Sequence, residues 1–370
     1  MRKSRVIIRP ACSADFQAIA SLLDRIFGPK PFKQRNRLWQ WRYDTNPARI
    51  PEMPAFLVAE QGERIVGVHG LTPMRIKAGE KLYHTSCSCD FAVDPSNRSA
   101  GMKIKLEALS RGMSPLHIST SANEPANKIT LALGGKEFAA GRRKLLKPFK
   151  VSGLLQKNLI RKAGAFGRSV AGIIGILAGK PLDWLLAIGR VLQSYSRVPD
   201  AVICPINRFD RRFDRLWDRI SRDYSILIVR DSLYLNWRYA DYPFEGVESY
   251  SLVREDELLG YAVIHNHIDE DNLRFTALLE LVVPGEEKAV FEHLLAETFH
   301  RAVKSGAHYI SARTSGVEWE ERFRRHGFKV RDSGYSPVTY KNNTDLPNEF
   351  FADERKWYVS LGDGDSCYYY

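Results

Sequence analysis

A short motif occurs twice in this chain of 370 residues, and the repeat limits the folds that the chain can adopt. The tripeptide Trp-Arg-Tyr at residues 41–43, followed by Pro47, recurs 196 residues later at 237–239, followed by Pro243. Two copies at so wide a spacing favour duplicated domains over a solenoid of short repeats. Aromatic and arginine side chains suit an acceptor site, but a shared packing role is favoured because both copies carry the motif.

The chain has the composition of a globular protein, with a hydrophobic fraction of 44% and a clear excess of positive charge. Its formal net charge of +12 favours acidic partners, such as nucleic acid, anionic lipid or a phosphorylated ligand. The five cysteines do not suggest a disulfide framework, and Cys87 and Cys89 are expected on one face of a strand, as core residues. No His-Cys cluster has zinc-ligand spacing, so no metal site is predicted. The N-terminus lacks the apolar run of a signal peptide, and we expect a cytoplasmic setting.

Strand and helix patterns follow one another in a definite order over the first 140 residues. A strand at 6–10 and a helix at 15–27 come first, and a helical turn at 38–47 ends at a proline. Hairpin turns at 61–63 and 78–81 then connect antiparallel strands, the last of which enters a β-α-β unit. The order predicts an α/β fold of the α+β type, in which helices flank a mixed, mostly antiparallel sheet.

The join between strand and helix in the β-α-β unit is a candidate anion site. The sequence Arg-Ser-Ala-Gly-Met-Lys at 98–103 follows a turn at 94–97 and opens the helix. Free N–H groups at a helix start carry about half a positive charge, and phosphate is a natural ligand for them. The pattern predicts core-facing positions and solvent-facing positions along this helix: Met102, Ile104, Leu106 and Leu109 inside, and Lys103, Lys105 and Glu107 outside.

Residues 6–140 resemble an N-acyltransferase domain of the GNAT type. The family's acyl-CoA signature, Arg/Gln-x-x-Gly-x-Gly/Ala after a strand, is matched at Arg98 and Gly101 and departs at Lys103, where a small residue is usual. The resemblance implies acetyl-CoA, or another acyl-CoA, as the cofactor. It also implies that loop amides hold the CoA pyrophosphate and that the preceding strand pairs with the pantetheine arm. The cofactor-binding residues that it implies are Phe91, Ala92, Val93, Arg98, Ser99, Ala100, Gly101, Met102 and Lys103.

Direct acyl transfer to an amine needs a base for the lost proton and a proton donor for the departing thiolate. Many members of the resembled family place a tyrosine acid about four residues before a Gly-Phe turn, and this chain has Thr130 and Leu131 there. Asn123 and Glu124 stand where the sheet is expected to splay and are the first polar candidates for catalysis. A structural role is equally favoured, because Asn123 is a good helix N-cap and Glu124 suits the first turn.

Asp90 is the third catalytic candidate, as a base. Alternation along the strand puts it on the opposite face from Cys89 and Phe91, and a solvated strand acid is its favoured alternative role. Asp363 and Asp365 near the C-terminus suit a cation or an amino-sugar ammonium, although a solvated turn is the favoured interpretation.

The second copy lacks the candidate anion loop. Its corresponding strand ends at Pro284, and Gly-Glu-Glu-Lys at 285–288 puts two carboxylates where an anion would lie. We therefore assign cofactor binding to the first copy and expect the second to shape the acceptor cleft, in a tandem arrangement that resembles the FemAB-type transferases. The expected boundaries are 1–144 for the first domain, 145–222 for a helical insertion, 223–345 for a degenerate second domain and 346–370 for a C-terminal strand and tail.

The insertion combines a basic cluster with an apolar stretch. Residues 142–163 hold eight Lys or Arg and no acid, and residues 164–188 are apolar and glycine-rich. The stretch falls short of the about 20 uninterrupted apolar residues that span a bilayer. One hypothesis is in-plane contact of 145–206 with a membrane surface. A helical linker packed on both domains is the other, and it is favoured.

The residues and the resemblance together lead to an enzyme hypothesis with two alternatives. The first is an acyl-CoA-dependent N-acyltransferase that acetylates a primary amine of a sugar or glycan precursor, in cell-surface polysaccharide biosynthesis. Its acceptor is a small-molecule or glycan amine, and no specific nucleic acid is expected. The alternatives are a FemAB-like transferase that uses aminoacyl-tRNA, which the net charge allows, and a non-catalytic protein at the inner membrane surface.

Overall fold

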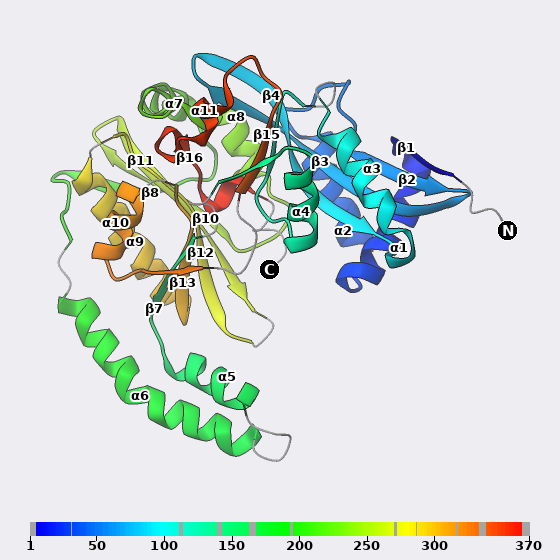
Figure 1. Ribbon diagram of the computed structural model, residues 1–370. Helices are drawn as coiled ribbons and strands as arrows, with labels where there is room; N and C mark the ends of the chain where they lie inside the picture. The colour runs from blue at the N-terminus through cyan, green and yellow to red at the C-terminus, as the bar shows by residue number, and fades with distance from the viewer. Residues whose placement is uncertain are drawn as a thin grey trace.

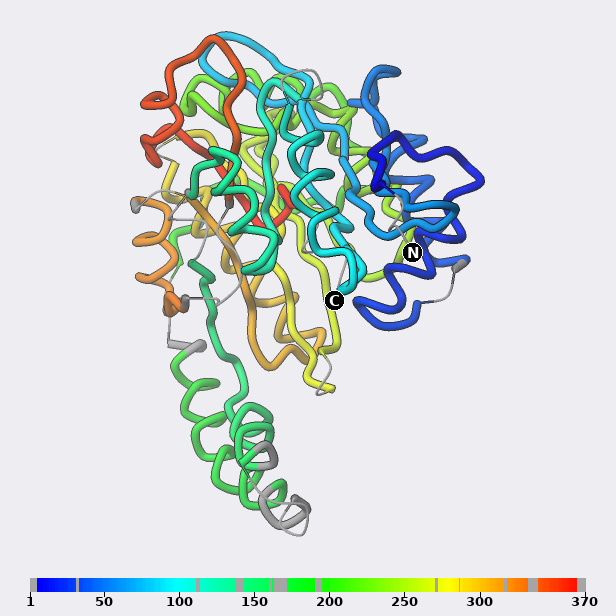
Figure 2. The backbone as a smooth tube through the Cα atoms, turned by 45° about the vertical axis from the view of Figure 1, so that its right-hand side comes forward, coloured from blue at the N-terminus to red at the C-terminus, as the bar shows by residue number. Residues whose placement is uncertain are grey.

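The chain forms a body with two mixed β-sheets and the helices that cover them, and a long helical hairpin projects from this body (Figures 1 and 2). The computed structural model describes residues 5–30, 32–110, 114–138, 143–162, 168–192, 195–269, 272–285, 287–315, 317–332 and 338–364.

The first sheet is built mainly from the N-terminal part of the chain. Its main path has the strand order β1-β2-β3-β4-β5-β15-β6, with β9 paired to β3 and β16 paired to β9. Its strands are β1 (Val6–Pro10), β2 (Phe56–Gln61), β3 (Arg64–Ala78), β4 (Lys81–Val93), β5 (Leu116–Ser119), β6 (Lys136–Phe138), β9 (Ile226–Ile228), β15 (Val338–Asn342) and β16 (Trp357–Tyr358). On the main path, β4 and β5 are parallel and the other neighbours are antiparallel, so the predicted mixed, mostly antiparallel sheet is confirmed.

The second sheet repeats this plan with the order β8-β10-β11-β12-β13-β7-β14. Its strands are β7 (Arg143–Pro148), β8 (Ala201–Pro205), β10 (Val247–Arg254), β11 (Glu257–Ile268), β12 (Arg274–Val282), β13 (Tyr309–Ala312) and β14 (Lys329–Asp332). Here β12 and β13 are the parallel pair, in the position that β4 and β5 have in the first sheet.

Each sheet has, within its main path, one strand from the other half of the chain. β15, which comes late in the sequence, lies between β5 and β6 of the first sheet. β7, which comes early, lies between β13 and β14 of the second sheet. The segment 145–222, expected to be helical, therefore also supplies β8 and most of β7.

Helices cover both faces of each sheet. α1 (Phe16–Phe27) and α3 (Arg98–Ala108) pack on opposite faces of the first sheet, and α7 (Arg211–Asp223) and α9 (Lys288–Lys304) do so on the second. The remaining helices are α2 (Phe32–Trp39), α4 (Glu124–Ala132), α5 (Ser152–Lys162), α6 (Arg168–Leu192), α8 (Ser232–Leu235), α10 (Val317–Arg325) and α11 (Asn348–Ala352). α2 and α8 each continue into a π-helical turn, Gln40–Asp44 and Asn236–Ala240, which holds one copy of the Trp-Arg-Tyr motif.

The two motifs meet between the sheets. The indole rings of Trp41 and Trp237 are stacked, with centroids 4.8 Å apart and planes inclined by 11°. Each indole Nε1 donates a hydrogen bond of 2.7 Å to the backbone carbonyl of the other tryptophan. Both residues are buried, so the predicted packing role of the motif is confirmed.

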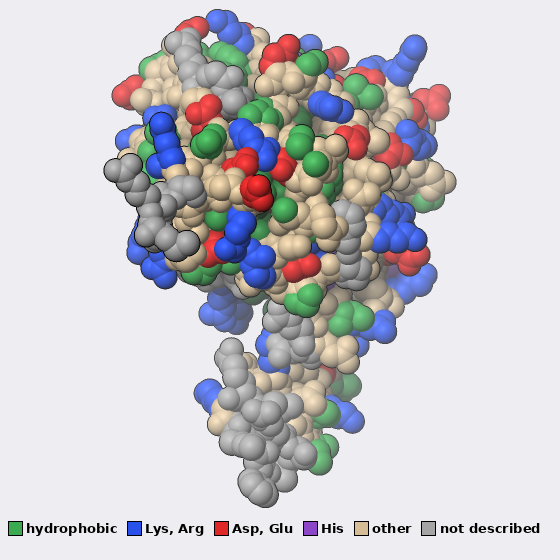
Figure 3. Space-filling view, turned by 90° about the vertical axis from the view of Figure 1, so that its right-hand side faces the viewer, with side chains coloured by type: hydrophobic (Ala, Val, Ile, Leu, Met, Phe, Trp, Pro, Cys, Tyr) green, Lys and Arg blue, Asp and Glu red, His purple; other side chains and the backbone are tan. Residues whose placement is uncertain are grey.

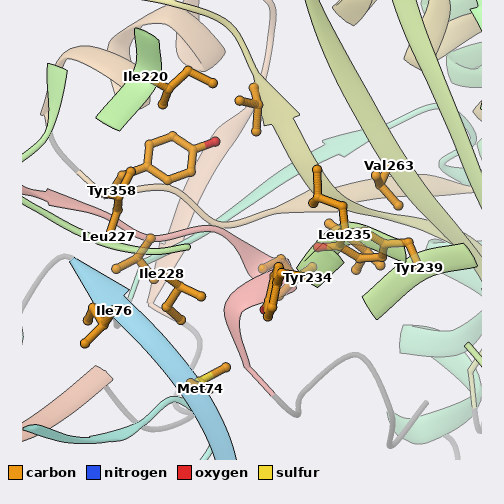
Figure 4. Packing of buried hydrophobic residues seen from close by; sticks show 14 of the residues in the cluster. Met74, Ile76, Ile220, Leu227, Ile228, Tyr234, Leu235, Tyr239, Val263 and Tyr358 are labelled. Carbon is orange, nitrogen blue, oxygen red and sulfur yellow. The ribbon is translucent and has the colours of Figure 1, made fainter. Parts of the chain in front are cut away.

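One hydrophobic core draws on both sheets. Figure 4 shows Met74 and Ile76 of β3 near Leu227 and Ile228 of β9, and the same cluster includes Val263 of β11. Each such side chain stabilises the fold by about 1.5–3 kcal/mol when it is fully buried. The shared core and the exchanged strands join the two halves.

The hairpin of α5 and α6 is held together by two glycines and one aspartate. A Cβ at Gly175 would lie 2.5 Å from Cα of Gln156, and a Cβ at Gly179 would lie 2.2 Å from Cα of Ser152. Only glycine permits so close an approach of two helices. Asp183 of α6 accepts hydrogen bonds from the N–H and Oγ of Ser152 at 3.1 and 2.5 Å, at the start of α5.

The other face of α6 is apolar and uncovered. Within the described residues, 172–189 is the one stretch that is long and apolar enough to cross a membrane by length and composition, and 17% of it is buried. Its exposed large apolar side chains are Ile173, Ile174, Leu177, Leu182, Trp184 and Leu185. The expectation of a linker helix packed on both domains is therefore wrong for this face.

Candidate functional site

β4 and β5 pair over a short length and then separate. Two residue pairs join them, Ser86 with His117 and Cys87 with Ile118. Beyond these pairs, the edge of β4 from residue 88 to 93 faces no strand among the described residues. Peptide groups on such an edge are free to pair with an extended ligand. We call this edge and the space beside it the β4–β5 splay.

A β-bulge lies in β4 at the splay. The register of β4 on β3 shifts between Val68 and Gly70, and Asp90 has a left-handed backbone with φ of 46°. Cys89 packs in the cluster under α1, whereas Phe91 packs in the cluster under α3. The expectation that Cys89 and Phe91 share a face is wrong, because the extra residue of a bulge inverts the alternation.

Asp90 is buried, so its interpretation as a solvated strand acid is wrong. Its carboxylate accepts a hydrogen bond from Nη1 of Arg42 at 2.8 Å and from Nε1 of Trp39 at 3.4 Å. Arg42 belongs to the first Trp-Arg-Tyr motif and is itself fully buried. The ion pair therefore ties the bulge to the π-helical turn and fixes the shape of the splay.

The start of α3 lies at the end of the free edge. α3 begins at Arg98, so the predicted join at 98–103 forms the first turns of the helix rather than a separate loop. The N-cap residue Asn97 makes no side-chain hydrogen bond to the helix, and the first turn holds no acid. Arg98, Ser99 and Lys103 are exposed. N–H groups without a capping side chain, together with two cations, make this end of the splay attractive to anions.

Gly101 lets α3 approach β4. A Cβ at this position would lie 3.3 Å from Cγ2 of Val93 and 3.6 Å from Cζ of Phe91. Gly101 is thus packed against the strand, and the exposed positions of the first turn are the ones open to a ligand. Lys103, which replaces the usual small residue, is exposed and leaves this contact undisturbed.

Asn123 and Glu124 are engaged at the start of α4. Oδ1 of Asn123 accepts a hydrogen bond of 3.0 Å from the N–H of Ala126, as an N-cap does. Glu124 is largely exposed and forms an ion pair of 2.7 Å with Lys128. The structure gives both residues the capping role that was the alternative to catalysis.

The corresponding splay of the second sheet is filled by the chain itself. β12 and β13 separate after Leu278 and Ala312, and residues 357–364 enter the space between them. The hydroxyl of Tyr358 donates a hydrogen bond of 3.1 Å to the carbonyl of Leu281. The cavity that remains there is about 10 Å³, room for at most about one water molecule.

Asp363 secures this segment. Its carboxylate accepts a hydrogen bond of 2.6 Å from Nη2 of Arg230, whose Nε donates to Glu280 at 3.3 Å. All three side chains are buried, so the interpretation of Asp363 as part of a solvated turn is wrong. Asp365 lies outside the described residues.

Internal carboxylates also lie near the helix start of the second copy. The N–H of Gly285 donates a hydrogen bond of 2.8 Å to the carboxylate of Asp223. Glu287, the N-cap residue of α9, pairs with Arg219 at 3.0 Å. An internal carboxylate thus binds a backbone N–H just before α9, as Asp94 does with the N–H of Ser96 just before α3.

A buried polar cluster at the closed end of the β4–β5 splay was missed by the sequence reasoning. Oγ of Ser88 lies 2.7 Å from Nε2 of His69, 2.8 Å from Nε2 of His117 and 2.8 Å from Nζ of Lys105. Oγ of Ser86 lies 3.0 Å from Nδ1 of His117. The cluster joins β3, β4, β5 and α3.

The prediction that Lys105 faces solvent is wrong, and so is the prediction that Met102 and Leu106 face the core. Met102 and Leu106 are exposed by 40% and 58%, whereas Lys105 is fully buried. The inner face of α3 is formed by small residues, Ala100, Gly101 and Ala108, together with Ile104 and Lys105. Their spacing of three and four residues was the signal that places position 105 inside.

Burial sets the protonation of the cluster. It lowers the pKa of Lys105 to about 8, so the amine is mostly protonated at pH 7. Burial and the nearby Lys105 ammonium lower the pKa values of His69 and His117 well below the usual range, so both rings are neutral. Two further buried polar atoms, Oγ of Ser119 on β5 and Oδ1 of Asn127 on α4, have no hydrogen-bond partner among the described residues.

A family match covers the part of the chain that holds β4 and α3 of this site. Residues 7–114 match the model of a family described as an acetyltransferase (GNAT) domain, and no curated protein matches the chain. The matched segment includes the free edge of β4 and all of α3. Residues 7–114 are thus similar to a GNAT acetyltransferase domain, and the predicted enzyme class, an acyltransferase, is confirmed.

Solved structures share the fold over nearly the whole chain. A GCN5-related N-acetyltransferase from Anabaena variabilis matches with a TM-score of 0.60 at 11% identity, over 92% of this chain and 73% of that one. A conserved protein of unknown function from Enterococcus faecalis, described as a probable N-acyltransferase, matches with a TM-score of 0.59 at 11% identity. The match covers 95% of this chain and 75% of that one. A GCN5-related N-acetyltransferase from Kribbella flavida matches with a TM-score of 0.56 at 15% identity, over 91% of this chain and 71% of that one. At these identities the likeness shows the fold alone, and it extends beyond residue 114 into the second sheet.

Proposed function

We propose that the chain is an acyl-CoA-dependent N-acyltransferase that binds its acyl donor in the β4–β5 splay. One observation carries the proposal: the free edge of β4 leads directly to the uncapped, basic start of α3. A ligand with a phosphate group and an extended amide-bearing arm has the chemistry for both parts.

The residues present fit such a ligand. The first-turn amides of α3, with the side chains of Arg98 and Lys103, would bind the pyrophosphate. The edge at 91–93 would pair with the pantetheine arm, and the unpartnered Oδ1 of Asn127 suits one of its amide groups. When bound, acyl-CoA supplies a thioester carbonyl that an amine can attack.

For the acceptor, we propose a primary amine of a sugar or glycan precursor, in a polysaccharide pathway of the cytoplasm. The net charge of +12 supports an acceptor that carries phosphate, such as a sugar nucleotide. Asp90 is the proposed base because it lies at the bulge of the splay. Asn123 and Glu124 are weaker candidates, since both are engaged at the start of α4.

The second sheet is, in this proposal, a degenerate copy of the first, in a FemAB-like tandem arrangement. The common strand order and the matching position of the parallel pair support duplication. Residues 357–364 fill the second splay, so it would hold no acyl donor and would instead support the acceptor site.

The cofactor assignment is tested by calorimetric titration of the whole chain with CoA. Ser99→Glu places a carboxylate at the helix start and should weaken binding at least tenfold, which is about 1.4 kcal/mol. Leu106→Glu, on an exposed position of the same helix away from its start, is the matched control and should change binding less than twofold. Failure of the wild type to bind CoA would refute the proposal, and unchanged binding by Ser99→Glu would refute the position of the site. Gly101 is unsuitable for this test because any side chain there meets β4.

Use of aminoacyl-tRNA is the competing source of the acyl group. It would give binding to tRNA that falls steeply with salt, without binding to CoA. Filter binding of tRNA at two salt concentrations, beside the CoA titration, separates the two donors.

We also propose that the α5–α6 hairpin contacts an anionic membrane surface in the plane of the interface. The exposed apolar face of α6 supports this, and so does the charge, because residues 150–192 hold seven Lys or Arg and one acid, Asp183. Figure 3 shows Lys and Arg side chains and hydrophobic side chains on the described part of the hairpin, below the body. A second copy of the chain is disfavoured as the partner that covers the apolar face of α6, because two positively charged hairpins would repel each other.

Flotation of the whole chain with lipid vesicles tests the membrane contact. Binding should be strong with phosphatidylglycerol present and weak with phosphatidylcholine alone. The double change Leu177→Glu and Trp184→Glu should abolish flotation, whereas Leu233→Glu, an exposed site on the body, should not. Equal flotation of the two variants would contradict the proposed surface.

A further inference from the structure

Lys105 is a buried cation with neutral neighbours only. Its Nζ donates to Oγ of Ser88 at 2.8 Å, lies 3.4 Å from Nε2 of His69 and sits 5.2 Å from the ring centre of Phe91. Among the described residues, no carboxylate comes within ion-pair distance of this amine. An isolated buried charge is costly unless a counter-ion or a ligand offsets it.

The cluster around Lys105 contains no other charge. His69 and His117 are held neutral by their burial and by Lys105 itself. The lysine is thus the single formal charge at the closed end of the β4–β5 splay. Packing of α3 does not require an ammonium there, since an apolar residue would pack on the sheet without the penalty.

Lys105 lies on the side of the splay that a ligand would enter. Ser88 is two residues beyond Ser86, and Ser119 is two beyond His117, so both follow the last paired residues on the face of α3. Oγ of Ser88 contacts Lys105, and Oγ of Ser119 is buried without a partner among the described residues. An ammonium and two hydroxyls therefore gather where β4 and β5 begin to part.

This end of the splay is remote from the phosphate end. Lys105 is seven residues after Arg98, which is about 10 Å along the helix. Ser88 is five residues before Val93, which is about 16 Å along the strand. A single phosphate group at the start of α3 cannot serve as counter-ion to Lys105, but the far end of an extended acyl donor lies in its direction.

We propose that the acyl group transferred by this protein ends in a carboxylate, and that Lys105 is its counter-ion with Ser119 as a hydrogen-bond donor. The inference rests on the proposed acyl-CoA site and names the class of acyl group that the site takes. The carboxylate would supply the negative charge that the cluster lacks and would accept from the unpartnered hydroxyl of Ser119. An alkyl chain of the same length would leave the ammonium unpaired and cover polar groups without hydrogen bonds.

The test compares three probes by calorimetric titration of the whole chain: CoA, butyryl-CoA and succinyl-CoA. Butyryl and succinyl groups have the same number of carbons and differ in the terminal carboxylate. The wild type should bind succinyl-CoA at least tenfold more tightly than butyryl-CoA. Lys105→Met should reduce this ratio to less than twofold while CoA itself binds as before. Lys103→Met, two positions away and exposed, is the matched control and should weaken all three probes alike.

The outcomes distinguish the acyl-CoA site from the class of acyl group that it takes. If CoA fails to bind the wild type, the proposed function itself is wrong. If CoA binds and the wild type does not prefer succinyl-CoA, the acyl site remains and the carboxylate inference is overturned. A preference that persists in Lys105→Met overturns the role of the lysine. The wild-type comparison needs no variant, so it decides the question even if Lys105→Met does not fold.

Discussion

Lys105 makes the stability of the fold depend on pH in a defined direction. Burial lowers its pKa from 10.5 to about 8, so the folded protein binds this proton less tightly than the unfolded chain does. At pH values below about 8 the lysine is protonated in both states, and the folded state carries the full penalty of about 3 kcal/mol. Between the two pKa values the folded protein loses the proton first, and the penalty disappears as the pH rises.

Replacing Lys105 by Met should therefore stabilise the protein at pH 7, by up to about 3 kcal/mol less about 1 kcal/mol for each hydrogen bond lost. The gain should shrink as the pH approaches 10. Chemical denaturation at pH 7 and pH 10 measures it, with Lys103→Met as a control that should show no such trend. A gain of equal size at both pH values would show that charge burial is not its origin.

The Arg42–Asp90 pair should respond strongly to the loss of one partner. Asp90→Ala leaves a fully buried guanidinium without its carboxylate, and we expect a loss of about 3–5 kcal/mol in the free energy of unfolding. Glu321→Ala, which breaks an exposed pair with Arg325, should cost under about 1 kcal/mol. Similar losses of stability in the two variants, measured by denaturation, would contradict the expectation that the buried Arg42–Asp90 pair matters more than an exposed pair.

Burial of single polar residues was the least predictable property of this chain. Asp90 is paired with Arg42, 48 residues away, and Asp363 with Arg230, 133 residues away. Local alternation carries no information about such partners. The bulge at Asp90 also reverses the face of every later residue in β4, which a regular period of two cannot represent.

At the scale of the elements, the repeated Trp-Arg-Tyr motif was predicted to pack, and it does so between the halves. The order of strands and helices around the candidate site was also predictable, because hairpin turns and helical periodicity are local signals. The strand exchange was not, since it depends on which edge a strand reaches after folding. The filling of the second splay by residues 357–364 escaped prediction for the same reason.

The stacked tryptophans should be coupled energetically. Trp237→Ala removes a buried ring and a hydrogen bond to Trp41, and we expect a loss of about 3–5 kcal/mol. A double-mutant cycle with Trp41→Ala should give a coupling energy of at least about 1 kcal/mol, because each ring is the other's partner. Trp184→Ala, exposed on α6, should leave denaturation unchanged. Additive losses at Trp41 and Trp237 would contradict the reciprocal contact.

At the scale of the whole molecule, the halves should fold only together. A fragment of residues 1–162 lacks β15 and β9, and a fragment of residues 168–370 lacks β7. Each alone would expose unpaired strand edges and the shared core, and we expect aggregation. Coexpressed, with a tag on one fragment, they should purify as a one-to-one complex. A fragment 1–162 that is soluble and unfolds cooperatively on its own would refute this expectation.

The exchange of β15 has a consequence for how the protein is made. Ser119 of β5 pairs with Thr339 of β15, so this edge of β5 stays unpaired until residues 220 positions later in the chain have been synthesised. At bacterial or eukaryotic rates of synthesis of about 5–20 residues per second, this is a delay of about 10–40 s. During that time the nascent chain, still on the ribosome, carries an open sheet edge beside the future site. Cotranslational folding of the N-terminal half therefore stops before its sheet is complete, and release of the C-terminal segment from the ribosome is the step that completes it.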